Sequence, residues 1–342
     1  MKLGLALPYS DRVPRELILA MVKAADQLGY DSLWLPEVYG WDAFTALTEF
    51  ACATERIQLG TGIINVFSRS PALIGQTAAS LDAISGGRFR LGLGTSGHQV
   101  VEGWHGVRYE KPIQRLRETV EVVRSVLRRD RLDHQGEVFQ LSGRLKLMTH
   151  PIRDRIPIYL ATLTPAGVEL AGEIADGWIP IFYSPAHFDT VFRPQLERGA
   201  QRAGRSLEDL SICVFQQVVV SDDIAAARDA VRPHLALYVG GMGSRQKNYY
   251  NRLFHAYGLG GEATRIQDLY LDGRHRDAAA AISDEMVDLV TIAGPSAECR
   301  RRLQALAESG VGEVAMILQV PGDDIEAMRS ALQELAPAGT AA

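Results

Sequence analysis

The 342-residue sequence predicts an α/β fold, a (β/α)8 TIM barrel with insertions. Strand-like and helix-like stretches alternate through the whole chain, and eight strands are expected, which is typical of a parallel sheet with helical crossovers. The central strands are apolar runs with little alternation, as in strands that are covered on both faces. We expect one domain over residues 1–336 and a disordered tail at 337–342.

The first half of the chain contains four expected strands, at residues 2–7, 32–35, 57–65 and 88–94. Helices are expected between and after them, at residues 14–28, 43–54, 71–85 and 112–129. Pro14, Pro71 and Pro112 stand where a helix can begin, because proline fits the first helical turn. Gly29 and the pair Gly86-Gly87 stand where two of these helices should end.

The second half contains strands at residues 156–161, 177–182, 211–220 and 313–319. The helices expected around them cover residues 165–175, 184–203, 295–308 and 323–335. Three insertions are expected, at about 97–112, 132–148 and 222–288. The second should be a β-hairpin around Gln135-Gly136, and the third a group of helices after the seventh strand, interrupted at residues 238–243.

Composition limits the possible partners. The formal net charge is −5, which argues against nucleic acid, since phosphate binding needs a basic surplus. Cys52, Cys213 and Cys299 are far apart and form no CxxC motif, which suggests a reducing compartment. The chain shows no signal peptide and no apolar run of about 20 residues. We expect a cytoplasmic protein that acts on a small molecule, away from membranes.

Small and polar residues follow two neighbouring strands in the stretch from residue 57 to 106. The first strand ends in Thr61-Gly62-Ile63-Ile64-Asn65, and the second ends in Gly94-Thr95-Ser96-Gly97. Because the carboxyl ends of parallel strands meet at one rim, these residues should hold a ligand there.

Residues 92–97, GLGTSG, match the GxGxxG dinucleotide motif. That motif belongs at the first βα turn and needs an acidic residue about 20 positions later, whereas this one follows the fourth strand. A Rossmann site is therefore excluded. The segment is either a cradle of backbone amides for a ligand or a structural turn.

Glu37 follows the second strand and lies near Tyr39 and Trp41 in the sequence. A carboxylate at this rim is a candidate acid or base, or a group that orients a cofactor. The alternative is a solvated loop residue.

His98, Glu102 and His105 have helical spacing and could line one face. We expect no metal, because no further ligand cluster stands nearby and Gly103 and Gly106 weaken the helix. Lining of a substrate pocket, with Trp104 as an apolar wall, is the preferred interpretation. An exposed His98 without a role is the alternative.

With these residues in view, the chain resembles the bacterial luciferase-like flavin and deazaflavin oxidoreductases. The similarity is strongest to the branch that uses coenzyme F420, an 8-hydroxy-5-deazaflavin. It covers nearly the whole chain and is most specific at residues 59–97, 99–106 (QVVEGWHG), 173–185 (EIADGWIPIFYSP) and 237–243 (LYVGGMG).

The resemblance implies a flavin-like ring over a bulge in the third strand, where a non-prolyl cis peptide would join Gly62 to Ile63. It implies a set of residues around the ring and its ribityl chain: Glu37, Gly62, Ile63, Asn65, Thr95, Ser96 and Gly97. The phosphate would meet the amides of Ala161, Thr162, Leu163 and Thr164. The substrate pocket would include Tyr9, Trp41 and Trp104.

The chain departs from the related F420 enzymes at one position, because Val38 follows Glu37 where they carry a histidine near the reacting carbon. The candidate proton donors are therefore Glu37, His98, Glu102 and His105. We expect hydride transfer between F420 and a small organic substrate, by reduction of C=C, C=N or C=O. The alternatives are an FMN-dependent two-component monooxygenase and a non-catalytic flavin-binding barrel. A homodimer is expected.

Overall fold

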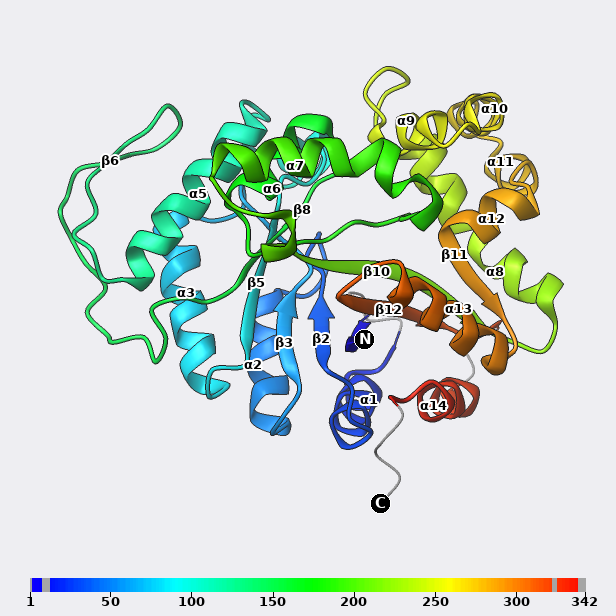
Figure 1. Ribbon diagram of the computed structural model, residues 1–342, viewed down its shortest axis with the longest axis horizontal. Coiled ribbons are helices and arrows are strands. Elements are labelled where there is room, and N and C mark those ends of the chain that lie inside the picture. The colour runs from blue at the N-terminus through cyan, green and yellow to red at the C-terminus, as the bar shows by residue number, and fades with distance from the viewer. Residues whose placement is uncertain (1, 8–12, 322–324, 338–342) are drawn as a thin grey trace.

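A closed barrel of parallel strands forms the centre of the protein (Figure 1). The computed structural model describes residues 2–7, 13–321 and 325–337. Within this part of the chain, the barrel strands follow in the order β1-β2-β3-β5-β8-β9-β10-β12, and β12 pairs with β1 to close the ring. Their bounds are β1 Lys2–Ala6, β2 Ser32–Leu35, β3 Gln58–Thr61, β5 Phe89–Gly94, β8 Ile158–Ala161, β9 Gly177–Trp178, β10 Ser211–Val220 and β12 Glu313–Gln319. The predicted eight-stranded barrel is confirmed.

An outer layer of helices covers the barrel. It contains α1 Arg15–Gln27, α2 Ala43–Ala53, α3 Pro71–Ile84, α5 Pro112–Leu127, α6 Pro165–Ile174, α7 Arg193–Arg202, α13 Ser296–Glu308 and α14 Ile325–Glu334. Polar side chains cap several of them: Asp42, Ser70 and Thr164 accept hydrogen bonds from the first turns of α2, α3 and α6. None of the described helices is long and apolar enough to cross a membrane.

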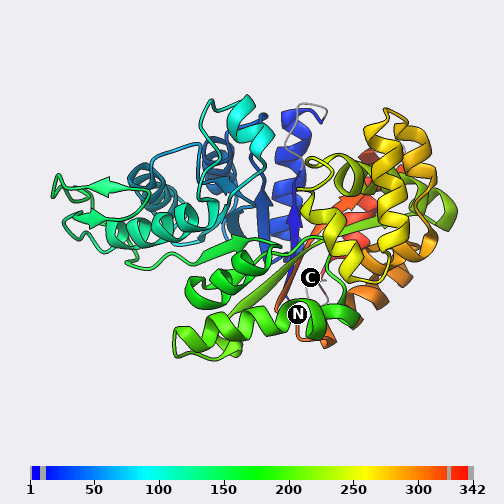
Figure 2. The same ribbon diagram turned by 90° about the horizontal axis from the view of Figure 1, so that it is seen from above.

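Three further groups of elements lie between the barrel strands and their covering helices, and the hairpin and the helical group lie on opposite sides of the barrel (Figure 2). A short helix, α4 His98–Gly103, follows β5. The hairpin of β6 His134–Gln135 and β7 Gln140–Leu141 is antiparallel. The helical insertion contains α8 Ile224–Ala236, α9 Tyr249–Ala256, α10 Gly260–Leu271, α11 His275–Ala280 and α12 Asp284–Val290, with a π-helical turn over Leu237–Gly241 at the predicted break.

Four expectations need correction. The third strand is not continuous, because β3 ends at Thr61 and a short strand, β4 Ile64–Asn65, follows. The sixth strand is shorter than 177–182, since only an isolated bridge joins Ile181 to Phe215 beyond β9. The helix expected at 184–203 begins with a 3-10 turn and a π turn before α7. The strand β11 Thr291–Gly294 was missed; it pairs with the end of β10, beyond the point where β9 stops.

Some expectations lie outside the described residues. These are Tyr9, the start of the last helix at residue 323, and residues 338–342 of the tail.

The barrel interior has an aromatic centre. Trp34 packs edge-on against Tyr159 and Phe215, with ring centroids 5.2 and 5.8 Å apart. Glycine is required at Gly60, because a Cβ there would lie 2.2 Å from the Trp34 ring. Four partly buried residues pack against this centre from the carboxyl side of the barrel: Ala6, Ala161 and Ile317 in strands, and Ile63 between β3 and β4.

A buried ion pair lies toward the amino-terminal end of the barrel. Arg90 Nη1 is 2.5 Å from Glu313 Oε2, and both side chains are nine-tenths buried or more. Ser32 Oγ also donates to Glu313, as does Trp34 Nε1 at 3.1 Å. Burial alone would raise the pKa of Glu313, but the charge of Arg90 and these hydrogen bonds hold it below its usual value.

Candidate active site at the carboxyl end of the barrel

A bulge interrupts the third strand at the carboxyl end of the barrel. β3 pairs Gly60 with Arg90, and β4 pairs Ile64 with Leu93, so four residue steps on one strand oppose three on β5. The extra residue falls where the peptide bond between Gly62 and Ile63 is cis. The predicted bulge and cis peptide are therefore confirmed.

The side chain of Thr61 bridges the strands beside the bulge. Its Oγ donates to Gly92 O and accepts from Gly92 N, both at 2.8 Å, where the backbone ladder is broken. Gly62 has no room for a side chain, because a Cβ there would lie 2.6 Å from Phe215. The backbone at the cis peptide therefore lies directly on the aromatic centre of the barrel.

The glycine-rich corner after β5 lies next to this bulge. Asn65 pairs with Gly94, and a Cβ at Gly94 would lie 3.0 Å from the Ile63 side chain. Ser96 takes a left-handed conformation with φ of 55°. Tyr109 supports the corner, because its hydroxyl lies 3.2 Å from both Thr95 Oγ1 and Ser96 O.

Glu37 makes a two-point contact with Arg69. The oxygens Oε1 and Oε2 of Glu37 lie 2.5 and 2.8 Å from Nη1 and Nη2 of Arg69. Oε2 also accepts from the backbone N–H of Ala43, at the start of α2. Arg69 Nη1 contacts Ser68 Oγ, which donates to the carbonyl of Asn65. Glu37 thus braces the loop that follows the bulge.

The α4 residues lie on the rim, but not all on one helical face. α4 ends at Gly103 and Gly106 has a φ of 67°, so His105 lies beyond the helix that carries His98 and Glu102. Glu102 accepts a hydrogen bond from the backbone N–H of Tyr109. Both histidines are partly buried.

Aromatic rings stand exposed on the same rim. Trp104 and Tyr39 are each 65% exposed, with their ring centroids 6.2 Å apart, and Trp41 is 42% exposed. Large exposed aromatic side chains gathered at the mouth of a barrel are suited to contact an apolar ligand.

The segment from Ala161 to Thr164 connects β8 to α6. Thr164 caps α6, accepting from Gly167 N, and the carbonyl of Thr162 accepts from Trp178 Nε1 at 2.9 Å. The Thr162 side chain packs against Gly167, where a Cβ would lie 2.7 Å from it. The Cβ and methyl group of Thr162 therefore lie against the first turn of α6, whose amino-terminal end suits an anionic group.

Three buried polar atoms at the carboxyl ends of the strands have no hydrogen-bond partner among the described residues. They are Asn65 Nδ2, Thr162 Oγ1 and Gln217 Oε1. Cys213, Phe215 and Gln217 lie two positions apart on β10 and therefore share one face of the strand. Cys213 and Phe215 belong to the interior cluster, so the Gln217 side chain points into the barrel. Since an unpaired buried polar atom costs free energy, such atoms fit a bound group that supplies the partners. The residues present therefore suit a polar ring with a phosphate-bearing chain.

The helical insertion is fastened to the rim by aromatic contacts around Phe182. The centroid of its ring lies 5.3, 5.8 and 6.0 Å from the ring centroids of Tyr238, Tyr250 and His234. Burial lowers the pKa of His234 to about 4, so this imidazole is neutral at physiological pH.

Sequence reasoning missed three contributors to the site. No sequence motif singled out Arg69 or Tyr109. Gln217 had a signal, because two adjacent glutamines interrupt the otherwise apolar run SICVFQQVVV.

A parallel barrel with its polar residues at the carboxyl ends of the strands has the organisation of the barrel enzymes. Within that class, the chain belongs to the luciferase-like monooxygenase family, whose model matches residues 4–313. The predicted resemblance is thereby confirmed.

Two curated relatives span almost the same length. A "putative coenzyme F420-dependent oxidoreductase" of Mycobacterium tuberculosis is 40% identical over 91% of this chain and 93% of its own. The 5,10-methylenetetrahydromethanopterin reductase of Archaeoglobus fulgidus is 29% identical over 92% of this chain and 93% of its own.

Among solved structures, the coenzyme F420-dependent tetrahydromethanopterin reductase of Methanopyrus kandleri matches with a TM-score of 0.82. The match covers 98% of this chain and 97% of the other, at 24% identity. An F420-dependent secondary alcohol dehydrogenase matches with a TM-score of 0.79 at 19% identity, over 98% and 97% of the two chains. These likenesses establish the fold.

Proposed function

We propose that the protein is an oxidoreductase that transfers a hydride between coenzyme F420 and a small organic substrate, by reduction of C=C, C=N or C=O. The observation that carries the proposal is the bulge at Gly62-Ile63, flanked by the unpaired Nδ2 of Asn65. The 40% identical relative is described as F420-dependent, which favours F420 over other flavins.

In this proposal the bulge and the corner at residues 94–97 hold the ring, and Asn65 donates to one of its polar atoms. The amides at Ala161–Thr164, with the Thr162 hydroxyl, receive the phosphate. When bound, F420 supplies the hydride from its deazaflavin ring. Trp41 and Trp104 supply apolar surface for the substrate.

The role of Glu37 is a positioning one in this proposal. Its carboxylate is already shared between Arg69 and the Ala43 amide, and its side chain is only 10% exposed. This leaves His98, Glu102 and His105 as the proton donors to test, with Glu37→Gln included for comparison.

A decisive test is an anaerobic titration of the purified protein with F420 and, separately, with FMN, followed by ring fluorescence. We expect saturable binding of F420 and weaker or absent binding of FMN. Binding of FMN alone, or oxygen consumption with reduced FMN, would replace the proposal with the two-component monooxygenase that the family description suggests.

Turnover is then tested by following oxidation of reduced F420 against a panel of enones, imines and ketones. Four single variants, Glu37→Gln, His98→Gln, Glu102→Gln and His105→Gln, are compared with the wild type. Loss of turnover with F420 binding retained excludes the non-catalytic alternative. Turnover that persists in all four single variants of the candidate donors would remove them from the mechanism.

We also propose a homodimer. The exposed face of α3 carries no charged side chain, and Leu73 and Ile84 on it are about half exposed. Light scattering should give twice the chain mass, and a Leu73→Glu variant should shift the protein to the monomer. A wild-type monomer at micromolar concentration would contradict the proposal.

A further inference from the structure

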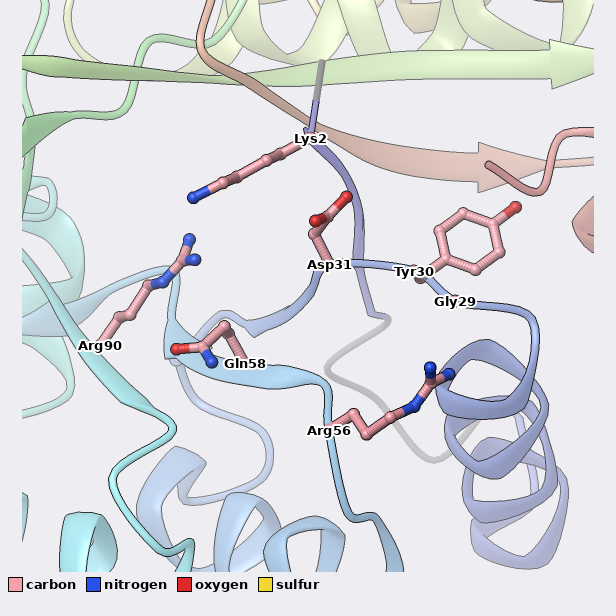
Figure 3. A pocket seen from close by; sticks show the side chains of 7 residues that line it. All are labelled: Lys2, Gly29, Tyr30, Asp31, Arg56, Gln58 and Arg90. Carbon is pink, nitrogen blue, oxygen red and sulfur yellow. The ribbon is translucent and has the colours of Figure 1, made fainter. Parts of the chain in front are cut away.

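A cleft opens at the amino-terminal end of the barrel, opposite the candidate active site (Figure 3). It has a volume of about 460 Å³ and is lined by Lys2, Gly29, Tyr30, Asp31, Arg56, Gln58 and Arg90. The candidate active site lies at the carboxyl ends of the same strands, so this cleft is separate from it. Its volume exceeds what a single water molecule or chloride ion needs.

Three polar side chains from different barrel strands converge in this cleft. Lys2 belongs to β1, Gln58 to β3 and Arg90 to β5. Each lies two positions before a glycine that faces the barrel interior, so its side chain points to the same side of the strand. Figure 3 shows the amine of Lys2, the guanidinium of Arg90 and the amide of Gln58 directed toward a common space. Arg56 turns away, and its guanidinium donates to the carbonyl of Asp26.

Lys2 is left without a charged partner among the described residues around this space. Arg90 is paired with Glu313 through Nη1, and Asp31 accepts from the backbone N–H of Leu3. In the part of the chain that the structure describes, Lys2 has no carboxylate within ion-pair distance. The formal charges of Lys2, Arg90, Asp31 and Glu313 cancel, but Asp31 is engaged by the Leu3 amide and Glu313 by Arg90. Two cations and an amide donor therefore share a recess in which Lys2 has no charged partner of its own among the residues described.

We propose that this cleft binds a compact oxyanion with two or more negative charges. Lys2 supplies a mobile point charge and Gln58 an amide donor. Arg90 is held rigidly by Glu313 and presents its remaining guanidinium edge. A divalent oxyanion would neutralise Lys2 and close the amino-terminal mouth of the barrel, so that binding stabilises the folded state.

The test is thermal unfolding of the whole protein, without F420, against increasing pyrophosphate or citrate, with potassium chloride at matched ionic strength as the reference. We expect a saturable rise in Tm with at least one oxyanion and none with chloride. A larger response to pyrophosphate identifies a phosphoryl ligand, and a larger response to citrate identifies a polycarboxylate.

Two variants locate the effect. Lys2→Gln should weaken oxyanion binding by about tenfold, the loss of one charge-assisted hydrogen bond. Gln58→Glu should abolish the response and raise the Tm measured without anion, because the chain then supplies its own carboxylate to Lys2 and Arg90. Lys23→Gln, which removes an exposed lysine of α1, is the control and should behave as the wild type.

A Tm that rises equally with chloride, or an oxyanion response that both cleft variants retain, would overturn the proposal. The F420 titration of these variants should match the wild type, so failure here is distinguishable from failure of the proposed function.

Discussion

At the amino-terminal end of the barrel, the buried carboxylate of Glu313 has partners from both β2 and β5. At the carboxyl-terminal end, Asn65, Thr162 and Gln217 each keep a buried polar atom without one. A fold shaped only by stability pairs its buried polar groups, because an unpaired one costs free energy. The difference indicates that the Glu313 network holds the barrel together, whereas the unpaired groups at the other end are available to a ligand.

The largest expected effect comes from breaking the pair at the amino-terminal end. Glu313→Gln leaves the Arg90 guanidinium nine-tenths buried without its counter-charge. We expect the free energy of unfolding in urea to fall by about 3–5 kcal/mol. Glu55→Gln removes an exposed carboxylate and should change it by less than about 0.5 kcal/mol. If Glu313→Gln lowers the free energy of unfolding no more than Glu55→Gln does, the ion pair at the amino-terminal end does not hold the barrel together.

Acid should remove part of the same stabilisation. The pKa of Glu313 is lowered in the folded state relative to an ordinary value of 4.5. Its contribution is therefore complete above pH 4.5 and is lost as the pH falls through the lower, folded-state pKa. The stability gap between wild type and Glu313→Gln should narrow by up to about 1.4 kcal/mol per pH unit in that range. A stability gap that widens as the pH falls would show that folding does not lower the pKa of Glu313.

A smaller effect is expected where the two roles meet, at Glu37. Glu37→Gln removes the charge from its contacts with Arg69 and the Ala43 amide. We expect a loss of about 2 kcal/mol in the free energy of unfolding, together with weaker F420 binding, because the loop after the bulge is no longer braced.

The control for Glu37 is Glu49→Gln, on the helix α2 whose first amide Glu37 contacts. Glu49 pairs with Arg15, whose side chain is 53% exposed, so its loss should cost less than about 1 kcal/mol. If Glu37→Gln lowers kcat and shifts its pH profile while stability and F420 affinity are unchanged, Glu37 is a proton donor and not a brace.

The smallest expected effect gives the sharpest comparison. Thr162→Val and Thr119→Val each remove a buried hydroxyl that has no partner among the described residues, but Thr119 lies on α5, away from the barrel mouth. Both variants should be as stable as the wild type within about 1 kcal/mol. Only Thr162→Val should weaken F420 binding, by about tenfold, in the fluorescence titration. Equal affinities in both variants would remove Thr162 from the cofactor site.

Much of the fold could be predicted from the sequence, because strand and helix limits depend on local chemistry. Pro71 and Pro112 begin helices, and Gly86 and Gly87 follow the end of α3 with positive φ. β11 was missed because TIAG is too short for a periodic signal and pairs only through its distant neighbour β10.

The site was less predictable than the fold. The bulge at Gly62-Ile63 was expected from family resemblance, since nothing in the local composition distinguishes a cis peptide. The contact of Glu37 with Arg69 joins residues 32 positions apart, and the support that Tyr109 gives to Thr95 follows from tertiary packing alone. Side-chain pairing across such separations has no periodic signature in a single sequence.

The two partners of β10 along one of its edges have a practical consequence. β9 pairs with its first residues and β11 with its last, and β11 directly follows the helical insertion. Both ends of that insertion therefore grow from the same strand pair. Anyone who exchanges it for the equivalent segment of a relative, to alter substrate choice, should cut before Thr291 and leave β11 in place, because a transferred β11 would have to pair with a β10 of different origin.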